Sequence, residues 1–135
     1  MDESHRMLRR RRAVRNEAEA PPRPLRVDVW PEGDAAHVCP FGELDLDTVS
    51  QVRDRLDELR AAGFTRLILD LRGVTFLDST GIRLVLETDA AARADGFDFG
   101  LIEGPANVQR PFEVTGLRGG LPFIDPPRGV GVPGS

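Results

Sequence analysis

The sequence predicts an α/β domain in which a mixed sheet of four or five strands carries its helices largely on one face. Three observations lead to this class. Apolar residues alternate with polar ones in short runs, they recur at helical spacing in longer runs, and the two kinds of run follow one another along the chain. The resulting order of elements is ββαβαβαβ, which requires both antiparallel and parallel neighbours within one sheet.

Two strands open the domain, over residues 25–29 and 35–41. The turn-forming sequence Pro31-Glu32-Gly33-Asp34 separates them and favours a hairpin. The first run alternates as a strand with one buried face does, and its apolar positions are Leu25, Val27 and Val29.

The first helix is expected from Val49 to Leu59, where apolar residues recur every three or four positions. Thr48 and Gln51 have the spacing of a capping box at its start. Gly63 follows the last apolar position and supplies a C-terminal stop. The next strand, over residues 67–71, is the most apolar run of the chain and is expected to be central.

An apolar loop at residues 74–77 then leads into a helix over residues 82–94, which Gly96 closes. The loop is expected to hold the start of this helix against the core. The remaining elements are a fourth strand at residues 97–101, a third helix that begins at Gly104-Pro105 and stops at Gly116, and a short last strand at residues 121–124.

Composition divides the chain into one domain and two tails. The domain covers residues 25–125, the Arg-rich segment 1–24 is expected to be disordered, and the Pro- and Gly-rich segment 126–135 is expected to be flexible. The run Arg9-Arg10-Arg11-Arg12 in the first tail is suited to contacts with anionic lipid or nucleic acid. A solvated tail is the simpler interpretation, because a short basic run binds weakly at physiological salt.

The distribution of charge argues against a domain that binds nucleic acid directly. Every basic side chain other than the two histidines is an arginine, and seven of the 18 arginines lie in residues 1–24 with four acids. Residues 25–135 therefore hold eleven arginines against eighteen acids. A protein that reads a duplex needs a basic face, and this domain is acidic.

No apolar stretch is long enough to span a bilayer, and the start of the chain lacks the pattern of a secretory signal. We therefore expect a cytoplasmic protein without a membrane partner. The single cysteine, Cys39, cannot form an internal disulfide and is expected to be a small buried apolar residue. With two histidines and one cysteine the chain offers no zinc ligand set, so neither a metal nor a cofactor is expected.

The most informative segment is Asp78-Ser79-Thr80-Gly81, at the start of the second helix. An ordinary N-cap at Asp78 or Ser79, worth about 1 kcal/mol, would explain one polar residue here. It would not explain three consecutive hydrogen-bonding side chains followed by a glycine. We interpret Ser79 as an exposed site for a regulatory phosphate, since a helix N-terminus tolerates negative charge.

A second candidate segment is Gly42-Glu43-Leu44-Asp45, between the second strand and the first helix. A turn with acids at the entry of a helix accounts for its spacing. An acidic rim that contacts a basic partner accounts for it as well. Asp70, inside an apolar strand, needs a partner such as a backbone N–H group in the loop before Ser79, and a structural role is expected for it.

Catalysis by Ser79 would require a base, and the only histidines are His5 in the tail and His37 in a strand. The serine lacks the Gly-x-Ser-x-Gly surroundings of a nucleophile elbow. A phosphate-cradling loop with lysine is impossible in a chain without lysine. A binding module is therefore favoured over an enzyme.

Taken together, four segments resemble the STAS domain, and in particular bacterial anti-sigma factor antagonists. They are Gly42-Glu43-Leu44-Asp45 and residues 69–74, 76–81 and 108–117, and the resemblance extends over residues 25–125. It implies a STAS-like fold and phosphorylation at the serine that follows the aspartate, here Ser79. It also implies a partner that is an anti-sigma factor, itself a serine kinase of the histidine-kinase-like ATPase type.

In such a system the unphosphorylated protein captures the anti-sigma factor and frees a sigma factor, and a phosphatase resets the phosphorylated form. ATP would belong to the kinase rather than to this chain. The resemblance implies a partner-binding surface made of Gly42, Glu43, Asp45, Asp78, Ser79, Thr80 and Gly81.

The sequence departs from the family pattern in three places. The Arg-rich leader is unusual, Pro126-Pro127 stands where a last helix commonly follows, and Arg83 replaces a residue that is often small. These departures leave the choice of partner open. An alternative with the same fold is a lone STAS subunit that regulates a membrane lipid or anion transport complex by docking on its ATPase, and the basic tail favours this alternative mildly.

Overall fold

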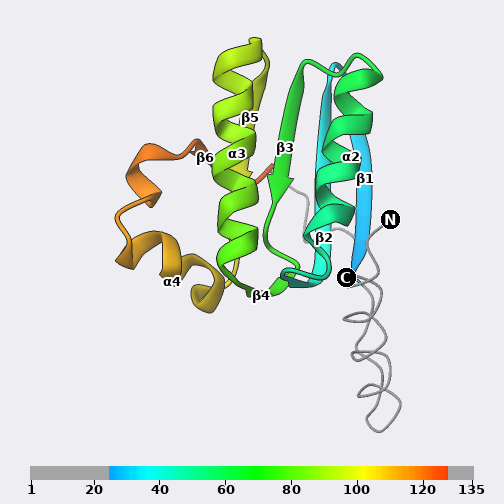
Figure 1. The fold of residues 1–135 in the computed structure, drawn as a ribbon. Coiled ribbons are helices and arrows are strands. Elements are labelled where there is room, and N and C mark those ends of the chain that lie inside the picture. Colours follow the sequence, from blue (N-terminus) through cyan, green and yellow to red (C-terminus); the bar gives the residue numbers. More distant parts are fainter. Residues whose placement is uncertain (1–24, 128–135) are drawn as a thin grey trace, which may run out of the picture.

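The computed structural model describes residues 25–127 as a mixed sheet with helices against it (Figure 1). The predicted tails, including the basic run Arg9–Arg12, lie outside the described residues except for Pro126 and Pro127. The strands are β1 (Arg26–Glu32), β2 (Ala35–Leu44), β3 (Arg66–Asp70), β4 (Val74–Leu77), β5 (Asp98–Ile102) and β6 (Phe123–Ile124). The helices are α2 (Val49–Ala61), α3 (Ser79–Asp95) and α4 (Ala106–Val114), with a 3-10 turn η1 (Arg118–Gly120).

The sheet has the strand order β1-β2-β3-β5-β6, with β4 paired to β2 outside this path. The hairpin of β1 and β2 is antiparallel, and β2–β3, β3–β5 and β5–β6 are parallel. The predicted α/β class and the predicted order of elements are confirmed, apart from one additional strand. Within the described residues the sheet therefore has six strands rather than four or five.

The additional strand is β4, where the sequence indicated a loop. It forms because β2 continues past its predicted end at Phe41 to Leu44 and offers a free edge to residues 74–77. Gly42 makes the continuation possible, since its φ of +122° is a conformation that side chains with a Cβ rarely adopt and the register shifts at this point. Residues 42–44 are thus strand and not turn.

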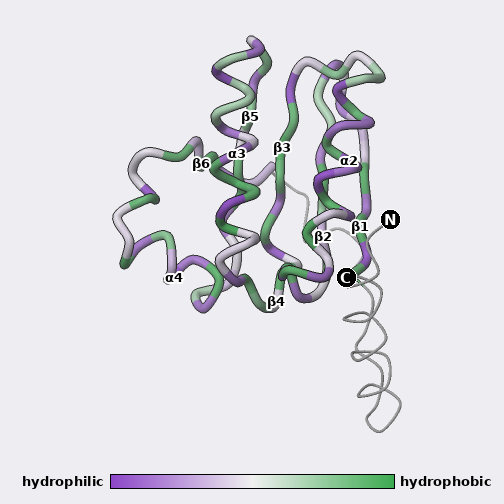
Figure 2. The backbone as a smooth tube through the Cα atoms, in the orientation of Figure 1, coloured by the Kyte–Doolittle hydropathy of each residue, from purple (hydrophilic) through white to green (hydrophobic). Residues whose placement is uncertain are grey.

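The main core lies between the sheet and the helices. In Figure 1, α2 and α3 lie in front of the strands, and Figure 2 shows α2 alternating between hydrophobic and hydrophilic residues. This alternation gives each helix one apolar stripe to bury. The core joins Val52 and Leu56 of α2, Leu84 and Val85 of α3, and Val108 and Phe112 of α4 to strand residues that include Val38, Leu67, Leu69 and Leu101.

The helix ends agree with the sequence at their C-termini, and α2 also begins at its predicted residue, Val49. The predicted cap of α2 and the predicted start of α3 differ from the structure. Gly63, Gly96 and Gly116 all have positive φ, as the predicted stops require. The capping box at Thr48 is wrong, because the Thr48 hydroxyl donates to the Glu43 carbonyl at 2.8 Å and does not cap α2. The helix α3 begins at Ser79, three residues before its predicted start at 82.

The last elements are shorter than predicted. Only Phe123–Ile124 forms a strand, and η1 occupies part of the connection from α4. None of the helices within residues 25–127 has the length and apolar character that crossing a membrane requires.

Candidate functional site

The fold brings the two candidate segments together at one edge of the sheet. Because β4 lies parallel to the end of β2, with Glu43 beside Phe76 and Leu44 beside Leu77, both strands end at the same place. The loop into α2 and the start of α3 therefore adjoin, at the lower end of the molecule in Figure 1.

Asp78 connects these two segments. Its backbone is extended, and its Oδ1 accepts hydrogen bonds from the N–H groups of Thr80 (2.9 Å) and Gly81 (3.2 Å) and from the Thr80 hydroxyl. Its Oδ2 accepts from the N–H of Leu46 at 3.2 Å. Asp78 is thus the N-cap of α3 and also fixes the loop that follows β2.

The hydrogen bonds of Asp78 favour its ionised form. Partial burial alone would raise the pKa of Asp78, but the Thr80 hydroxyl and the N–H groups of Gly81, Thr80 and Leu46 outweigh it, and the net pKa lies below the usual value. The carboxylate is therefore charged at neutral pH and remains part of the helix start.

Ser79 is the first residue of α3, and its side chain is exposed. Within the described residues its hydroxyl makes no hydrogen bond, whereas the hydroxyl of Thr80, which is partly buried, donates to Asp78. The structure thus agrees with the expected presentation of this serine to solvent. Of the two neighbouring hydroxyls, only that of Ser79 is available to another molecule.

Gly81 allows α3 to begin close to the sheet. It is buried, and a Cβ at this position would lie 2.4 Å from Cδ1 of Leu77 and 3.2 Å from the carbonyl oxygen of Leu44. Contacts this short require the neighbours to move. The glycine of the segment is therefore explained by the close approach of the helix to the ends of β2 and β4.

The two acids of the second segment differ in their surroundings. The Oδ1 of Asp45 accepts hydrogen bonds from the N–H groups of Asp47 (3.0 Å) and Thr48 (3.2 Å) and thereby stabilises the turn before α2. The carboxylate of Glu43 is exposed and has no hydrogen bond or ion pair within the described residues. Glu43 is thus the acid of this segment that is free to meet a partner.

Sequence reasoning missed the apolar side chains beside Ser79. Leu46 is 63% exposed and Phe76 is 46% exposed, although Phe76 belongs to the run expected to pack against the core. Only Val74 and Leu77 of that run are buried. The pairing of β4 with β2 explains this, since Phe76 lies beside the exposed Glu43 and points away from the core, as Glu43 does.

A further exposed side chain, Arg83, lies four residues after Ser79 and hence on the same side of α3. We refer to the exposed side chains of Glu43, Leu46, Phe76, Ser79 and Arg83 as the Ser79 patch. It combines two apolar groups, one acid and one base around a free hydroxyl, which is a composition suited to contact with another protein.

Asp70 has the structural role that the sequence predicts. It is 1% exposed, and its carboxylate receives the guanidinium of Arg72 at distances of 2.7, 3.0 and 3.1 Å as well as the Arg72 N–H at 3.0 Å. This N–H belongs to the turn between β3 and β4 and not to residues 74–77, the segment before Ser79 in which the partner was expected. The pair holds this turn against the end of β3.

The structure does not bring a histidine to Ser79. His37 lies in the middle of β2, is 1% exposed and stacks on Trp30 with ring centroids 3.6 Å apart. Its Nε2 lies 3.3 Å from the carboxylate of Glu32. His5 lies outside the described residues. Among residues 25–127 there is also no group of three His, Cys, Asp or Glu side chains that could hold a metal ion.

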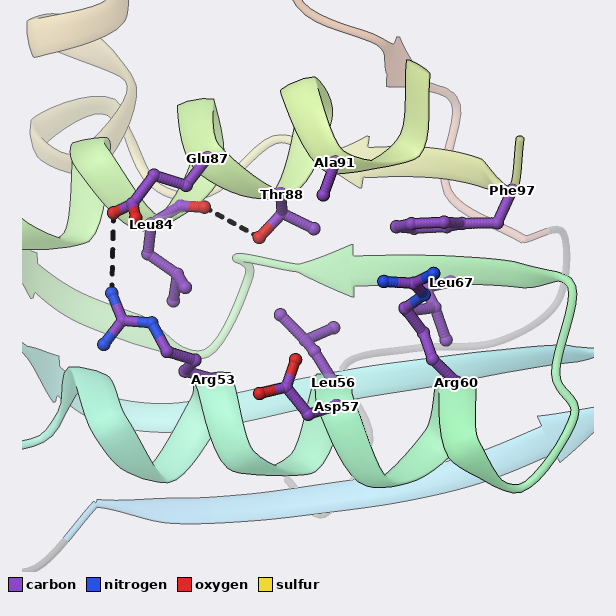
Figure 3. Close-up of a pocket in the computed structure, with 10 residues that line it drawn as sticks. All are labelled: Arg53, Leu56, Asp57, Arg60, Leu67, Leu84, Glu87, Thr88, Ala91 and Phe97. Atoms are coloured by element: carbon purple, nitrogen blue, oxygen red, sulfur yellow. Dashed lines mark hydrogen bonds and ion pairs between the residues drawn. The ribbon is translucent and has the colours of Figure 1, made fainter. Parts of the chain in front are cut away.

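A groove of about 230 Å³ lies between α2 and α3, away from the Ser79 patch (Figure 3). Internal pairs occupy it, since Arg53 lies 3.5 Å from Glu87 and Arg60 lies over the ring of Phe97 at 4.1 Å. The Thr88 hydroxyl is likewise used, by the carbonyl of Leu84. The groove therefore presents no converging set of free polar groups for a ligand.

Comparisons with known proteins agree with this geometry. The family model described as "Mlab, STAS domain" matches residues 32–124. The anti-sigma-B factor antagonist of Staphylococcus aureus strain NCTC 8325 is 31% identical over 77 residues, which cover 57% of this chain and 71% of that protein.

Two solved structures share the fold. The anti-sigma factor antagonist SpoIIAA in its unphosphorylated form has a TM-score of 0.62 at 24% identity, covering 77% of this chain and 89% of that one. The Bacillus cell fate determinant SpoIIAA in the phosphorylated form has a TM-score of 0.59 at 22% identity, covering 77% and 92%.

Proposed function

Because the chain belongs to the STAS domain family, we propose that it acts as an anti-sigma factor antagonist controlled by phosphorylation of Ser79. In its unmodified form it captures an anti-sigma factor and so releases a sigma factor. The observation that carries the proposal is the free hydroxyl of Ser79, exposed at the first residue of α3 within the Ser79 patch. The name of the Staphylococcus aureus relative supports the role.

The proposed partner is an anti-sigma factor that is also a serine kinase of the histidine-kinase-like ATPase type. It supplies ATP and phosphorylates Ser79, a phosphatase removes the phosphate, and the exchange takes place in the cytoplasm. The proposed contact surface contains the Ser79 patch together with Gly42, Asp45, Asp78, Thr80 and Gly81. Of these, Asp45 and Asp78 shape the surface through hydrogen bonds to the backbone.

Phosphorylation would release the partner without unfolding the domain. A phosphate adds about −1.5 to −2 charges, and the dipole of α3 stabilises it by about 0.3–2 kcal/mol. Burying the same dianion unpaired in an interface beside Asp78 costs several kcal/mol. A hundredfold loss of affinity requires only about 2.7 kcal/mol, so the docking penalty decides the outcome.

We propose a binding module and not a hydrolase. The one histidine within residues 25–127, His37, is stacked on Trp30 inside β2 and is bonded to Glu32. Ser79 accordingly lacks the adjacent base that a nucleophilic serine requires.

The test begins with a partner captured from the host cells on the wild-type protein and identified. Incubated with that partner and ATP, the wild type should gain the mass of one phosphate and Ser79→Ala should gain none. Ser50→Ala is the matched control, since Ser50 is also exposed in the first turn of a helix. Normal modification of Ser79→Ala would refute the site.

A second pair of variants tests the release mechanism. Ser79→Asp should bind the captured anti-sigma factor at least about tenfold more weakly than Ser79→Asn, which has the same shape without the charge. Both should keep the wild-type melting temperature. Equal affinities would refute electrostatic release.

The second candidate function is regulation of a membrane lipid or anion transport complex by docking on its ATPase. The observation that favours it is the run Arg9–Arg12, which is suited to anionic lipid. The captured partner separates the two candidates, because this function predicts a transporter ATPase that leaves Ser79 unmodified.

A further inference from the structure

Arg83 is an exposed cation of the Ser79 patch that no described side chain neutralises. It lies in the second turn of α3, four residues after Ser79, and has no hydrogen bond or ion pair within residues 25–127. Glu43, the acid of the same patch, does not pair with it either. The guanidinium thus points to an acceptor that belongs to another molecule.

The acids of α3 that could neutralise Arg83 are paired with other arginines. Glu87, one turn after Arg83, lies 3.5 Å from Arg53 of α2, and Figure 3 shows its carboxylate directed across the groove to that side chain. The two other acids of the helix form the pairs Asp89–Arg93 and Asp95–Arg60. A pair between Arg83 and Glu87 would suit the spacing of the helix, but the fold does not form it.

Arg83 lies within any interface that encloses Ser79. Four residues of an α-helix rise by only about 6 Å. A protein–protein interface of ordinary size covers about 800 Å² on each partner, which is a disc about 16 Å in radius. The inference rests on the proposed function, in which the anti-sigma factor closes over Ser79 to phosphorylate it. A partner that reaches this hydroxyl therefore also meets Arg83.

The surroundings of Arg83 require that this partner offer it an acceptor. Leu46 and Phe76 are exposed apolar side chains of the same patch, and a partner that covers them excludes water there. A guanidinium enclosed without an acceptor is unfavourable. Its planar fork matches a carboxylate, with which it forms two parallel charge-assisted hydrogen bonds.

We propose that Arg83 is a specificity-determining residue of the Ser79 patch. In the unphosphorylated complex its guanidinium binds a carboxylate of the anti-sigma factor. Partners that carry an acid at this place are accepted, and those with a base or an apolar surface there are disfavoured, because the charge of Arg83 is then repelled or left unpaired.

The test measures the affinity of the captured anti-sigma factor for variants of the full chain, without nucleotide, so that the acceptor belongs to the protein. Arg83→Gln removes the charge and keeps a long polar side chain, and it should weaken binding at least about fivefold. Arg83→Glu brings like charges together and should weaken binding at least about fiftyfold. Added salt should narrow the difference between the wild type and Arg83→Gln, since it screens the pair.

Arg66 provides the matched control. It is also exposed and without an ion pair within the described residues, but it lies beside Ala35 at the opposite end of the sheet. Nine residues of β2 separate Ala35 from Leu44 at the site, or about 30 Å. Arg66→Gln and Arg66→Glu should therefore bind within about twofold of the wild type. Binding by Arg83→Gln that equals or exceeds that of the wild type, or equal losses in the Arg66 and Arg83 variants, would overturn the proposal.

Charge reversal on the partner locates the acid. Among its single Asp→Arg and Glu→Arg variants, one should bind Arg83→Glu at least about tenfold more tightly than the unchanged partner does and should bind the wild type more weakly. The proposal is wrong if no variant does so. It also fails separately from the proposed function. Normal binding by Arg83→Gln, with Ser79 still phosphorylated, refutes only the carboxylate contact, whereas normal modification of Ser79→Ala refutes the proposed function.

Discussion

The buried thiol of Cys39 gives the protein a dependence on alkaline pH that can be calculated. Burial, followed by the negative charge of Asp70, raises the pKa of Cys39 from 9.0 to about 11. The folded state therefore holds the thiol proton about a hundredfold more tightly than the unfolded chain does, which corresponds to about 2.7 kcal/mol. This stabilisation is complete below pH 9 and is lost as the pH rises through 11.

The composition isolates this effect. The chain contains neither lysine nor tyrosine, and arginine remains charged throughout, so Cys39 is the one side chain that titrates between pH 9 and 11. Urea unfolding followed by the fluorescence of Trp30, the single tryptophan, should show a loss of about 2–3 kcal/mol over this range in the wild type. Cys39→Ala should show almost none. Parallel pH dependences of the two proteins would refute the reasoning.

Three further substitutions test the site and its support by urea unfolding. Asp78→Ala should lower the free energy of unfolding by about 1–2 kcal/mol at pH 7, because the N-cap of α3 is lost. Because the pKa of Asp78 is lowered in the folded state, this difference between variant and wild type should shrink below about pH 4, and a difference that stays constant would contradict the reasoning. Gly81→Ala should lower the free energy of unfolding by about 1–3 kcal/mol, because its methyl group would lie 2.4 Å from Cδ1 of Leu77. Gly119→Ala, with open space around it, should have no such effect, and equal effects would contradict the close approach of α3 to the sheet. Arg72→Met should lower the free energy of unfolding by about 3 kcal/mol, because it leaves the buried charge of Asp70 without its partner. Adding Asp70→Asn should restore part of this loss, and additive effects of the two substitutions would contradict the pairing.

Most of the fold could be predicted because it is encoded locally. The alternation in residues 25–29 and the helical spacing from Val49 to Leu59 are properties of neighbouring residues, and both elements are present. The strand β4 could not be found in this way. Residues 74–77 do not alternate, and they form a strand only because β2 extends beyond Gly42 and provides an edge for pairing.

In the candidate site, too, the local features could be predicted from the sequence and the long-range contacts could not. The exposure of Ser79 follows from a polar segment at a helix start, so the sequence was sufficient to expect it. The hydrogen bond from Leu46 to Asp78 joins residues 32 positions apart and has no local signal. The capping box at Thr48 failed for a related reason, because the threonine hydroxyl is satisfied by the carbonyl of Glu43, at the end of the preceding strand.

The effect of Arg83 on the proposed switch can be decided by magnitude. Its side chain lies one turn after Ser79 on the same side of α3, so its guanidinium would be within reach of a phosphate on that serine. An exposed pair at this spacing contributes about 0.3–0.5 kcal/mol, which is small against the several kcal/mol that desolvation of the phosphate costs in an interface. Arg83 therefore leaves the release mechanism intact. In the unphosphorylated form, however, it adds a long cation beside Phe76 and Leu46, and a partner must offer an acceptor or a gap there. Arg83, where the family often has a small residue, thus bears on which anti-sigma factor would fit the proposed surface, and not on whether the proposed phosphorylation would release it.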